Sequence, residues 1–264
     1  MTVSMKIVDI TPELAKEWLN GHNRHLRPTV WQRYARDMVA GDWVLNGETI
    51  KRTEDDTTDD GQHRLKAIIE SGCTIRSVVV FGLPHSAQET IDRGLPRNIP
   101  DALRLRGEKD VNNLAAAVAQ VIVLGSPQPT QNEYWPSTSE ATLFLDQHGS
   151  IRESCLVGAR LRQAVWTPAS TAAAMHFMFS RIDPGDADVF FASLGSGADL
   201  VDDSPILRLR EVMFREVTAN QRMRRPRLQA FYIKSWNAWR DGIPMKVLRW
   251  STGGSSPESF PVAR

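Results

Sequence analysis

The feature that most constrains the fold is a change in sequence pattern near residue 107. Before it, short runs typical of strands alternate with helical patterns. After it, apolar residues recur almost wholly at helical spacing. The 264 residues suffice for one large domain or two small ones. We therefore predict an α+β chain with a small mixed α/β domain over 1–107, an all-helical domain over 108–250 and an irregular tail over 251–264.

The first part has recognisable starts and stops for its elements. Strand patterns cover 5–10, 49–52 and 75–81, the last a β-branched run. A cap followed by proline at Thr11-Pro12 predicts a first helix, and a second is expected from Pro28 to a stop at Gly41. A third helix is expected over 61–71, ending at Gly72.

The second part is punctuated by helix-capping signals. Asp110 is expected to cap a long apolar helix. Ser137 with Glu140, and Ser150 with Glu153, match the capping-box pattern, in which a hydroxyl and a carboxylate three residues later cap each other's N–H groups. Further helices are expected at about 168–181, 185–194, 204–219 and 226–241.

Composition excludes several classes of protein. No run approaches about 18 consecutive apolar residues, so no membrane span is expected, and the N-terminus lacks a signal-peptide pattern. Two cysteines, Cys73 and Cys155, are too few for a disulfide framework and fit lone thiols in a reduced cytoplasmic setting. The net charge of +1 is uninformative about partners, because a total hides local patches.

The segment Asp60-Gly61-Gln62-His63-Arg64 carries the clearest chemistry. It reads as an extended piece, a glycine turn and a helix start. A helix N-terminus exposes N–H groups and a partial positive charge, and Gly61 allows a ligand to approach the backbone. His63 and Arg64 add donors, the latter as a planar fork suited to phosphate oxygens. The segment therefore predicts an anion site, although an ordinary solvated helix start has the same pattern.

This segment resembles the DGQHR motif of one branch of the ParB/sulfiredoxin superfamily. That superfamily includes CTP-binding ParB proteins, sulfiredoxin, a free-serine kinase and DndB-type regulators, in which the equivalent turn contacts nucleotide phosphates. Asn23-Arg24 with Arg27-Pro28, and Asp92-Arg93-Gly94 with Arg97 and Asp101, stand where the family has its flanking polar boxes. Over residues 5–107 the resemblance implies a nucleotide triphosphate, ATP or CTP, bound by Gly61, Gln62, His63, Arg64, Asn23, Arg24 and Arg97.

The chain departs from the family just before the motif. Relatives have an apolar strand there, whereas this chain has Thr57, Thr58 and Asp59, next to the acidic run 54–56. Negative charge weakens an anion site unless a metal bridges the two. One interpretation is a solvated acidic loop; the other is that Asp60, with Asp59, holds Mg²⁺ against the phosphates.

The candidate catalytic residues are Glu48, Asp60 and His63. Glu48 precedes the strand leading to the motif and is the candidate general base, with a plain turn carboxylate as the alternative. A sulfiredoxin activity is not expected, because its chemistry needs a cysteine in the phosphate-binding turn. His22 and His25 are spaced like a metal pair, but no third ligand matches them, so solvated histidines are favoured.

A basic stretch in the helical part suggests a nucleic-acid surface. Its centre is Arg222, Arg224, Arg225 and Arg227, preceded by Arg208, Arg210 and Arg215 and followed by Phe231, Tyr232, Trp236 and Trp239. Arginines beside exposed aromatic rings suit backbone contact and base stacking. The helical spacing of the rings instead indicates core positions under a solvated basic face.

Two functions remain open at this level. The first is a nucleotide-dependent phosphotransferase or NTPase with a DNA-related role, of a layout that resembles proteins of bacteriophages and mobile elements. The second is a DNA-binding regulator that uses nucleotide as a switch. DNA is a candidate partner of either, and a homodimer is left open.

Overall fold

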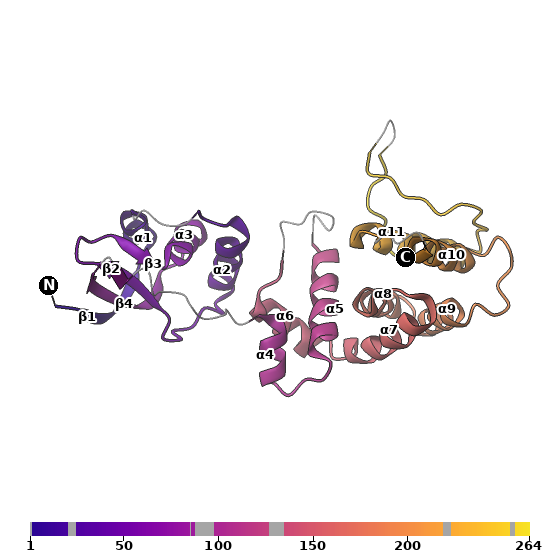
Figure 1. The fold of residues 1–264 in the computed structure, drawn as a ribbon, viewed down its shortest axis with the longest axis horizontal. Coiled ribbons are helices and arrows are strands. Elements are labelled where there is room, and N and C mark those ends of the chain that lie inside the picture. Colours follow the sequence, from indigo (N-terminus) through magenta and orange to yellow (C-terminus); the bar gives the residue numbers. More distant parts are fainter. Residues whose placement is uncertain are drawn as a thin grey trace. The chain divides into compact units, whose positions relative to one another are not determined.

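A computed structural model describes residues 2–20, 25–84, 86–87, 98–126, 135–218, 223–253 and 257–264. This part of the chain is an α+β fold with one four-stranded mixed sheet and eleven helices, which confirms the predicted class (Figure 1). No helix among the described residues is both long enough and apolar enough to cross a membrane.

The N-terminal elements form the sheet and the helices packed on it. They are β1 (Ser4–Ile10), α1 (Pro12–Trp18), α2 (Pro28–Ala40), β2 (Thr49–Thr53), β3 (Thr58–Asp60), α3 (Gln62–Ser71) and β4 (Ile75–Leu83). The strand order is β1-β4-β2-β3. β1 and β3 lie antiparallel to their neighbours, and β2 lies parallel to β4. All three predicted strands are confirmed.

The helices α1, α2 and α3 pack on one face of this sheet. Ile50 and Val79 from the strands are fully buried against Leu65 of α3, and Met38 of α2 is also buried there. The other face carries exposed apolar side chains on β1, including Met5 and Ile7. Successive side chains of a strand point to opposite faces of the sheet. The order of residues along each strand therefore determines which side chains the helices cover.

The predicted starts and stops of the first helices are confirmed. The Thr11 hydroxyl accepts from Leu14 N at 3.2 Å, and Pro12 opens α1. Pro28 opens α2, which ends at Gly41 in the left-handed conformation with φ 78°. α3 ends in the same way at Gly72, with φ 69°. Left-handed C-caps favour glycine because other residues bring a Cβ into contact with the backbone.

The remaining elements are helices. They are α4 (Ile99–Leu105), α5 (Val111–Leu124), α6 (Thr138–Gln147), α7 (Ile151–Val165), α8 (Ala169–Ser180), α9 (Pro184–Ser196), α10 (Pro205–Thr218) and α11 (Arg225–Arg240). α8 is buried nearly all round and packs against α7, where Gly158 lies so close to Ala169 O and Ala173 that no Cβ fits. The later helices enclose a core containing Phe179, Phe190 and Trp236.

Only one of the two predicted capping boxes forms. Ser137 N donates to Glu140 Oε2 at 2.5 Å, and Glu140 N donates to Ser137 Oγ at 3.1 Å. Ser150 instead has helical backbone angles and makes no side-chain cap bond, so that prediction is wrong. Asp110 has a left-handed backbone, with φ 47°, and it too does not cap α5 with its side chain. A side-chain cap generally requires extended backbone at the cap residue, which neither residue has.

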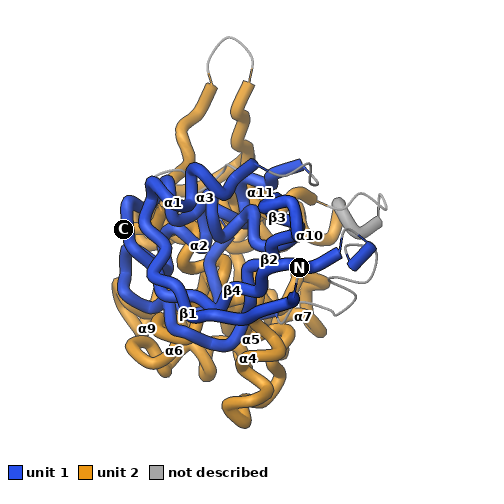
Figure 2. Tube along the Cα trace, turned by 90° about the vertical axis from the view of Figure 1, so that its left-hand side faces the viewer, with its two compact units in different colours: residues 1–98, 132–140 blue, residues 99–131, 141–264 orange. Residues whose placement is uncertain are grey.

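The chain divides into two compact units. Unit 1 comprises residues 1–98 and 132–140, and unit 2 comprises 99–131 and 141–264 (Figure 2). α4 belongs to unit 2 because Ile99 and Leu103 pack with Leu114 of α5, whereas the sequence pattern had placed the first boundary later, at 107. The tail beyond Ser251 has no helix or strand in its described residues, yet Phe260 packs it against the hydrophobic core of unit 2.

Candidate functional site

The glycine of the motif makes the tight turn from β3 into α3. Gly61 has φ 104° and ψ 5°, a conformation that residues with a Cβ rarely adopt. A Cβ built on it would lie 2.8 Å from Ile50 Cγ1 on the neighbouring strand. The turn is therefore pressed against β2, and the helix begins at once after the strand.

The N-termini of two helices meet at this turn. Arg27 N, at the start of α2, donates to Nε2 of His63 in the first turn of α3 at 3.0 Å. The N-cap residue of neither helix makes a side-chain cap bond, and neither helix has an acidic residue in its first turn. The partial positive charges of two helix N-termini thus lie close together, and no carboxylate from the first turn of either helix offsets them. Such an arrangement favours binding of an anion.

The cationic side chains at the turn are organised by Asp60. Lys51 Nζ contacts Asp60 Oδ2 at 2.7 Å, and Arg64 Nη2 contacts the same oxygen at 3.4 Å. The side chains of Asp60 and Arg64 are each only 12% exposed. Arg64 Nη1 is buried and has no hydrogen-bond partner in the described part of the chain. An unpaired buried donor costs about 1–3 kcal/mol, so this guanidinium N–H is a hydrogen-bond donor without an acceptor.

Lys51 was missed by the sequence analysis. It faces Asp60 directly across the β2–β3 pair. An opposite-charge pair in adjacent strands is the signal that could have found it, but only once the register of the hairpin is known.

The acidic turn lies at the far end of β3 from the motif. Glu54, Asp55 and Asp56 are exposed before β3, whereas Gly61 follows it. A three-residue strand spans about 10 Å, roughly one screening length at 0.1 M salt. The repulsion between the acidic run and an anion bound at the Gly61 turn is therefore weaker than the short separation in sequence suggests.

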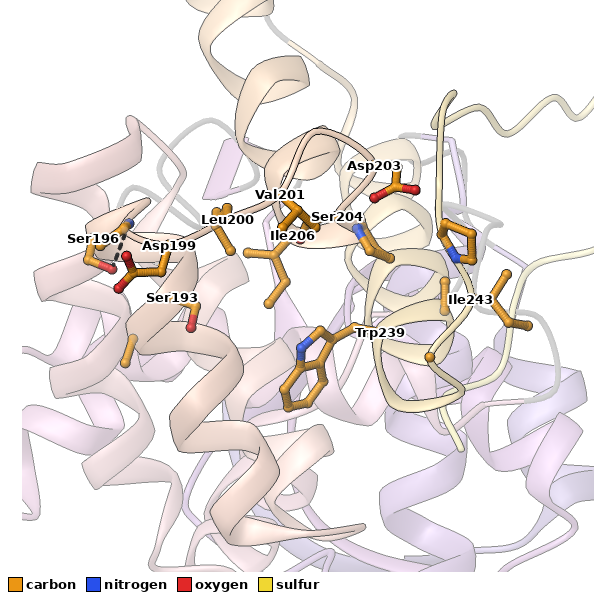
Figure 3. Close-up of a pocket in the computed structure, with 16 residues that line it drawn as sticks. Ser193, Ser196, Asp199, Leu200, Val201, Asp203, Ser204, Ile206, Trp239 and Ile243 are labelled. Atoms are coloured by element: carbon orange, nitrogen blue, oxygen red, sulfur yellow. Dashed lines mark hydrogen bonds between the residues drawn. The ribbon is translucent and has the colours of Figure 1, made fainter.

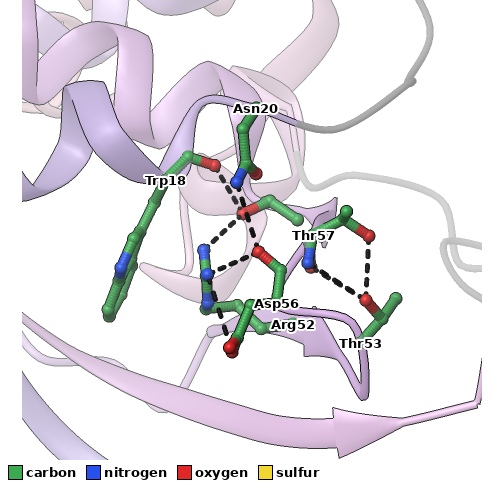
Figure 4. Close-up of polar contacts among 7 residues, drawn as sticks. Trp18, Asn20, Arg52, Thr53, Asp56 and Thr57 are labelled. Atoms are coloured by element: carbon green, nitrogen blue, oxygen red, sulfur yellow. Dashed lines mark hydrogen bonds and ion pairs between the residues drawn. The ribbon is translucent and has the colours of Figure 1, made fainter.

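The polar residues of β3 are accommodated by hydrogen bonds (Figure 4). Arg52, 4% exposed, donates to Thr58 Oγ1 at 3.2 Å and to Asp56 O at 2.6 Å, and its guanidinium lies 4.5 Å from the centre of the Trp18 ring. The Thr58 hydroxyl donates in turn to Trp18 O at 2.7 Å. Burial lowers the pKa of Arg52 from its ordinary value, against the effect of nearby Asp56. This network holds the short polar strand β3 in place.

The predicted pair of metal ligands does not form one site. Asp59 and Asp60 are consecutive residues of a strand, so their side chains leave on opposite faces. Asp60 is already bonded to Lys51 and Arg64. Among the described residues no group of three His, Cys, Asp or Glu side chains is placed to hold a metal ion. The strand geometry therefore separates Asp59 from Asp60, and Mg²⁺ itself stays a prediction.

The candidate catalytic side chains occupy different settings. His63 Nε2 accepts a hydrogen bond from Arg27, so in this arrangement its ring proton is on Nδ1 and the Nε2 lone pair is occupied. Glu48 is exposed in the turn before β2, where its N–H donates to Asn46 Oδ1 at 3.0 Å. The pairing of Lys51 with Asp60 puts the start of β2 at the same end of the sheet as the Gly61 turn. Gln62 is buried at 9% exposure.

Several predicted residues lie outside the described part of the chain. They are Asn23, Arg24, Arg97 and Arg222, together with His22 and Asp92-Arg93-Gly94. Asp101, the last residue of the second polar box, is in α4 of unit 2, where it pairs with Arg104 at 2.9 Å.

The cysteines fit the expectation of lone thiols. Cys155 is buried in unit 2, and burial raises the pKa of its thiol to about 12. Cys73 is half-buried just beyond the end of α3. A thiol with a raised pKa has little thiolate and is unreactive.

The basic stretch of unit 2 has exposed arginines but buried aromatic rings. Arg224, Arg225 and Arg227 are exposed at the start of α11. Phe231, Tyr232 and Trp236 are buried in the core, which confirms the core interpretation of their spacing and excludes them from base stacking. The earlier arginines are bonded internally: Arg210 donates to Leu194 O and Gly195 O, and Arg208 to Glu211.

Comparisons with protein-family models, with curated proteins and with solved structures find no match for this chain.

Proposed function

We propose that the chain binds the phosphates of a nucleoside triphosphate, ATP or CTP, at the turn where α2 and α3 begin. The observation that carries this proposal is the meeting of two helix N-termini through Arg27 and His63, and the unpaired Nη1 of Arg64 in the same first turn of α3 supports it. Phosphate oxygens would accept from N–H groups of the α3 first turn and from Arg64. The likeness of Asp60–Arg64 to the DGQHR motif of the ParB/sulfiredoxin superfamily supports the nucleotide as the source of those phosphates.

The proposed activity is transfer or hydrolysis of a terminal phosphoryl group, with a DNA-related role. Asp60 would position Lys51 and Arg64, whose charges offset the charge that develops on the phosphoryl oxygens. Glu48, at the same end of the sheet, would accept the proton of the attacking group, with His63 as the second candidate once its bond to Arg27 opens. Mg²⁺ would enter with the nucleotide rather than be held by Asp59 and Asp60 together.

A second candidate function is a regulator that binds DNA and uses the nucleotide as a switch. The observation favouring it is the set of exposed arginines Arg224, Arg225 and Arg227 at the start of α11. Cations at a helix N-terminus are opposed by the helix dipole, and a bound phosphate backbone would relieve that repulsion.

Calorimetric titration of the wild type with ATP, CTP and GTP, each with and without Mg²⁺, tests the binding proposal. We expect one nucleotide to bind and Arg64→Ala to weaken it at least about tenfold, because a charge-assisted hydrogen bond is lost. Arg104→Ala is the matched control, since it removes an exposed arginine in unit 2, and its affinity should stay within about twofold of the wild type. Absence of binding by folded wild type under every condition would contradict the proposal.

Turnover separates the two functions once a nucleotide is known to bind. For an enzyme, phosphate release should fall by about 100-fold in Glu48→Gln while the affinity is retained. For a regulator, nucleotide turnover is absent or slow, and bound nucleotide instead changes the affinity for DNA. The double variant Arg224→Ala with Arg227→Ala should then make that change in DNA affinity smaller.

A further inference from the structure

Unit 2 contains a pocket of about 660 Å³ that is distant in sequence from the proposed nucleotide site and independent of it (Figure 3). It is lined by the last turns of α9 and α11, by the loop 198–204 and by the first residues of α10. This volume is within the range of small-molecule sites, which combine apolar walls with a few polar groups.

The floor of the pocket is the ring of a tryptophan that packs against other aromatic rings of the core. Trp239 lines the pocket, and its ring lies 5.7 Å from that of Phe190 and 5.8 Å from that of Trp236, centre to centre. Leu200 and Ile206 add apolar surface beside it. The indole is therefore a fixed surface that remains half-buried and accessible.

The charged groups of the pocket are all negative. Asp199 and Asp203 line it, and none of its described lining residues is a lysine, arginine or histidine. Figure 3 shows the two carboxylates on either side of the Trp239 ring in that view. Neither carboxylate forms an ion pair within the described residues. The C-terminus of α11 adds a partial negative charge here, and the N-terminus of α10 adds a partial positive one, so the two carboxylates are the charged side chains that set the sign of the pocket lining.

The arginines nearest in the chain do not neutralise these carboxylates by contact. Arg210 donates to Leu194 O and to Gly195 O at 2.8 Å, at the end of α9. Arg208 donates to Met245 O at 3.3 Å and pairs with Glu211. Both guanidinium groups thus donate to acceptors other than Asp199 and Asp203, so neither carboxylate is ion-paired to them, although Arg210 keeps its positive charge beside Gly197 at the end of α9.

We propose that this pocket binds an alkylammonium ligand. An ammonium group over the face of an indole is attracted by the ring quadrupole, and tryptophan is the strongest aromatic partner for it. Asp199 and Asp203 accept its N–H groups, while the methylenes of the ligand lie on Leu200 and Ile206. An anion is repelled by the two carboxylates, and an uncharged alcohol of the same length lacks both attractions.

Calorimetry on the full chain at low ionic strength tests this with 1,4-diaminobutane and n-butylamine, against 1,4-butanediol as an uncharged ligand of matched length. We expect saturable binding of the amines with one site per chain, and none of the diol. If the diamine binds more tightly than the monoamine, both carboxylates contact one ligand. If the two amines bind equally, a single ammonium group accounts for the binding, and both outcomes support the proposal.

Variants locate the binding. Asp199→Asn with Asp203→Asn should weaken it at least about fivefold, because two charge pairs are lost. Asp202→Asn removes a carboxylate of the same loop that does not line the pocket, and should change affinity less than about twofold. Trp239→Leu keeps an apolar floor without the ring quadrupole and should also weaken binding, with circular dichroism confirming its fold. Equal losses in Asp202→Asn and in the double variant, or no saturable amine binding up to about 10 mM, would overturn the proposal.

Discussion

At the scale of single residues, the candidate site depends on one glycine. Gly61 combines a positive φ with a close approach to Ile50, so two separate physical reasons exclude a side chain there. The chain contains a natural comparison in Gly47, which also has positive φ, at 85°, but faces open space. The pair allows the contribution of the contact to be separated from that of the backbone conformation.

Gly61→Ala should therefore destabilise the fold more than Gly47→Ala does. We expect about 3 kcal/mol for Gly61→Ala and about 1 kcal/mol for Gly47→Ala, because only the first adds a clash to the cost of the left-handed backbone. Urea unfolding followed by circular dichroism measures both free energies. Equal losses would mean that β2 yields easily and that the contact with Ile50 does not restrain the turn.

Residue types at the site were predictable, whereas their pairings were not. Gly61, His63 and Arg64 stand out in the sequence because a glycine turn followed by donors at a helix start indicates an anion site. That His63 would bond Arg27, or that Lys51 would share Asp60 with Arg64, depends on contacts between elements far apart in sequence. Such contacts follow from packing, which periodicity alone does not specify.

At the scale of elements, unit 1 has a polar network between α2 and the segment that leads into α6. Asp37 Oδ1 accepts from Ser137 Oγ at 2.5 Å, and Arg36 pairs with Glu140 at 2.8 Å. Burial raises the pKa of Asp37 from its ordinary value of 3.8, the bond from Ser137 opposes this, and Glu140 adds to the increase. The stability that Asp37 contributes is therefore fully present below the unfolded value and is lost as pH rises through the raised folded value.

Asp37→Asn should consequently raise stability at neutral pH. The amide oxygen retains an acceptor for Ser137, and the charge near Glu140 is removed, so we expect a gain of roughly 0.5 kcal/mol at pH 7 after solvent screening. The gain should shrink as pH falls towards 3.8. Urea unfolding from pH 4 to 7.5 measures it. Asp42→Asn, at an exposed position just after α2, is the control and should show no such trend; a gain that stays constant with pH would rule out ionisation of Asp37 as its cause.

Helix positions were predicted better than helix caps. The expected helices at 168–181, 185–194, 204–219 and 226–241 correspond to α8, α9, α10 and α11, because apolar spacing is repeated over many residues. A capping box depends on the backbone angles of one residue. Ser137 forms one and Ser150, with φ −63° and ψ −15°, does not, although the two sequences match the pattern equally well.

At the scale of the whole molecule, each unit has its own hydrophobic core. Leu65 is fully buried in unit 1 with Ile10 and Ile50, and Leu194 is fully buried in unit 2 with Phe179 and Phe190. The pattern change near residue 107 indicated two parts, but it could not show that α4 packs with the later helices, because an isolated short helix has the same sequence pattern in either unit.

Two separate cores predict two separable unfolding transitions. Leu65→Ala and Leu194→Ala each leave a cavity and should cost about 2–5 kcal/mol. Differential scanning calorimetry should show Leu65→Ala lowering one transition and Leu194→Ala the other, so that each variant is the control for the other. A single transition lowered equally by both would show that the chain unfolds as one cooperative unit.

The docking of the last residues on α11 has a mechanical consequence. Trp236 Nε1 donates to Arg264 O at 3.0 Å, Asn237 Nδ2 donates to Val262 O at 2.9 Å, and Arg264 N donates to Asn237 Oδ1 at 3.1 Å. A pulling force on Arg264 acts first on these bonds, each worth about 1 kcal/mol, and on the ion pair of Arg264 with Asp241 at 2.6 Å, and only afterwards on the stacked rings of Phe179 and Trp236. Under a pulling force, the tail should therefore detach from α11 before the helical core itself is stretched.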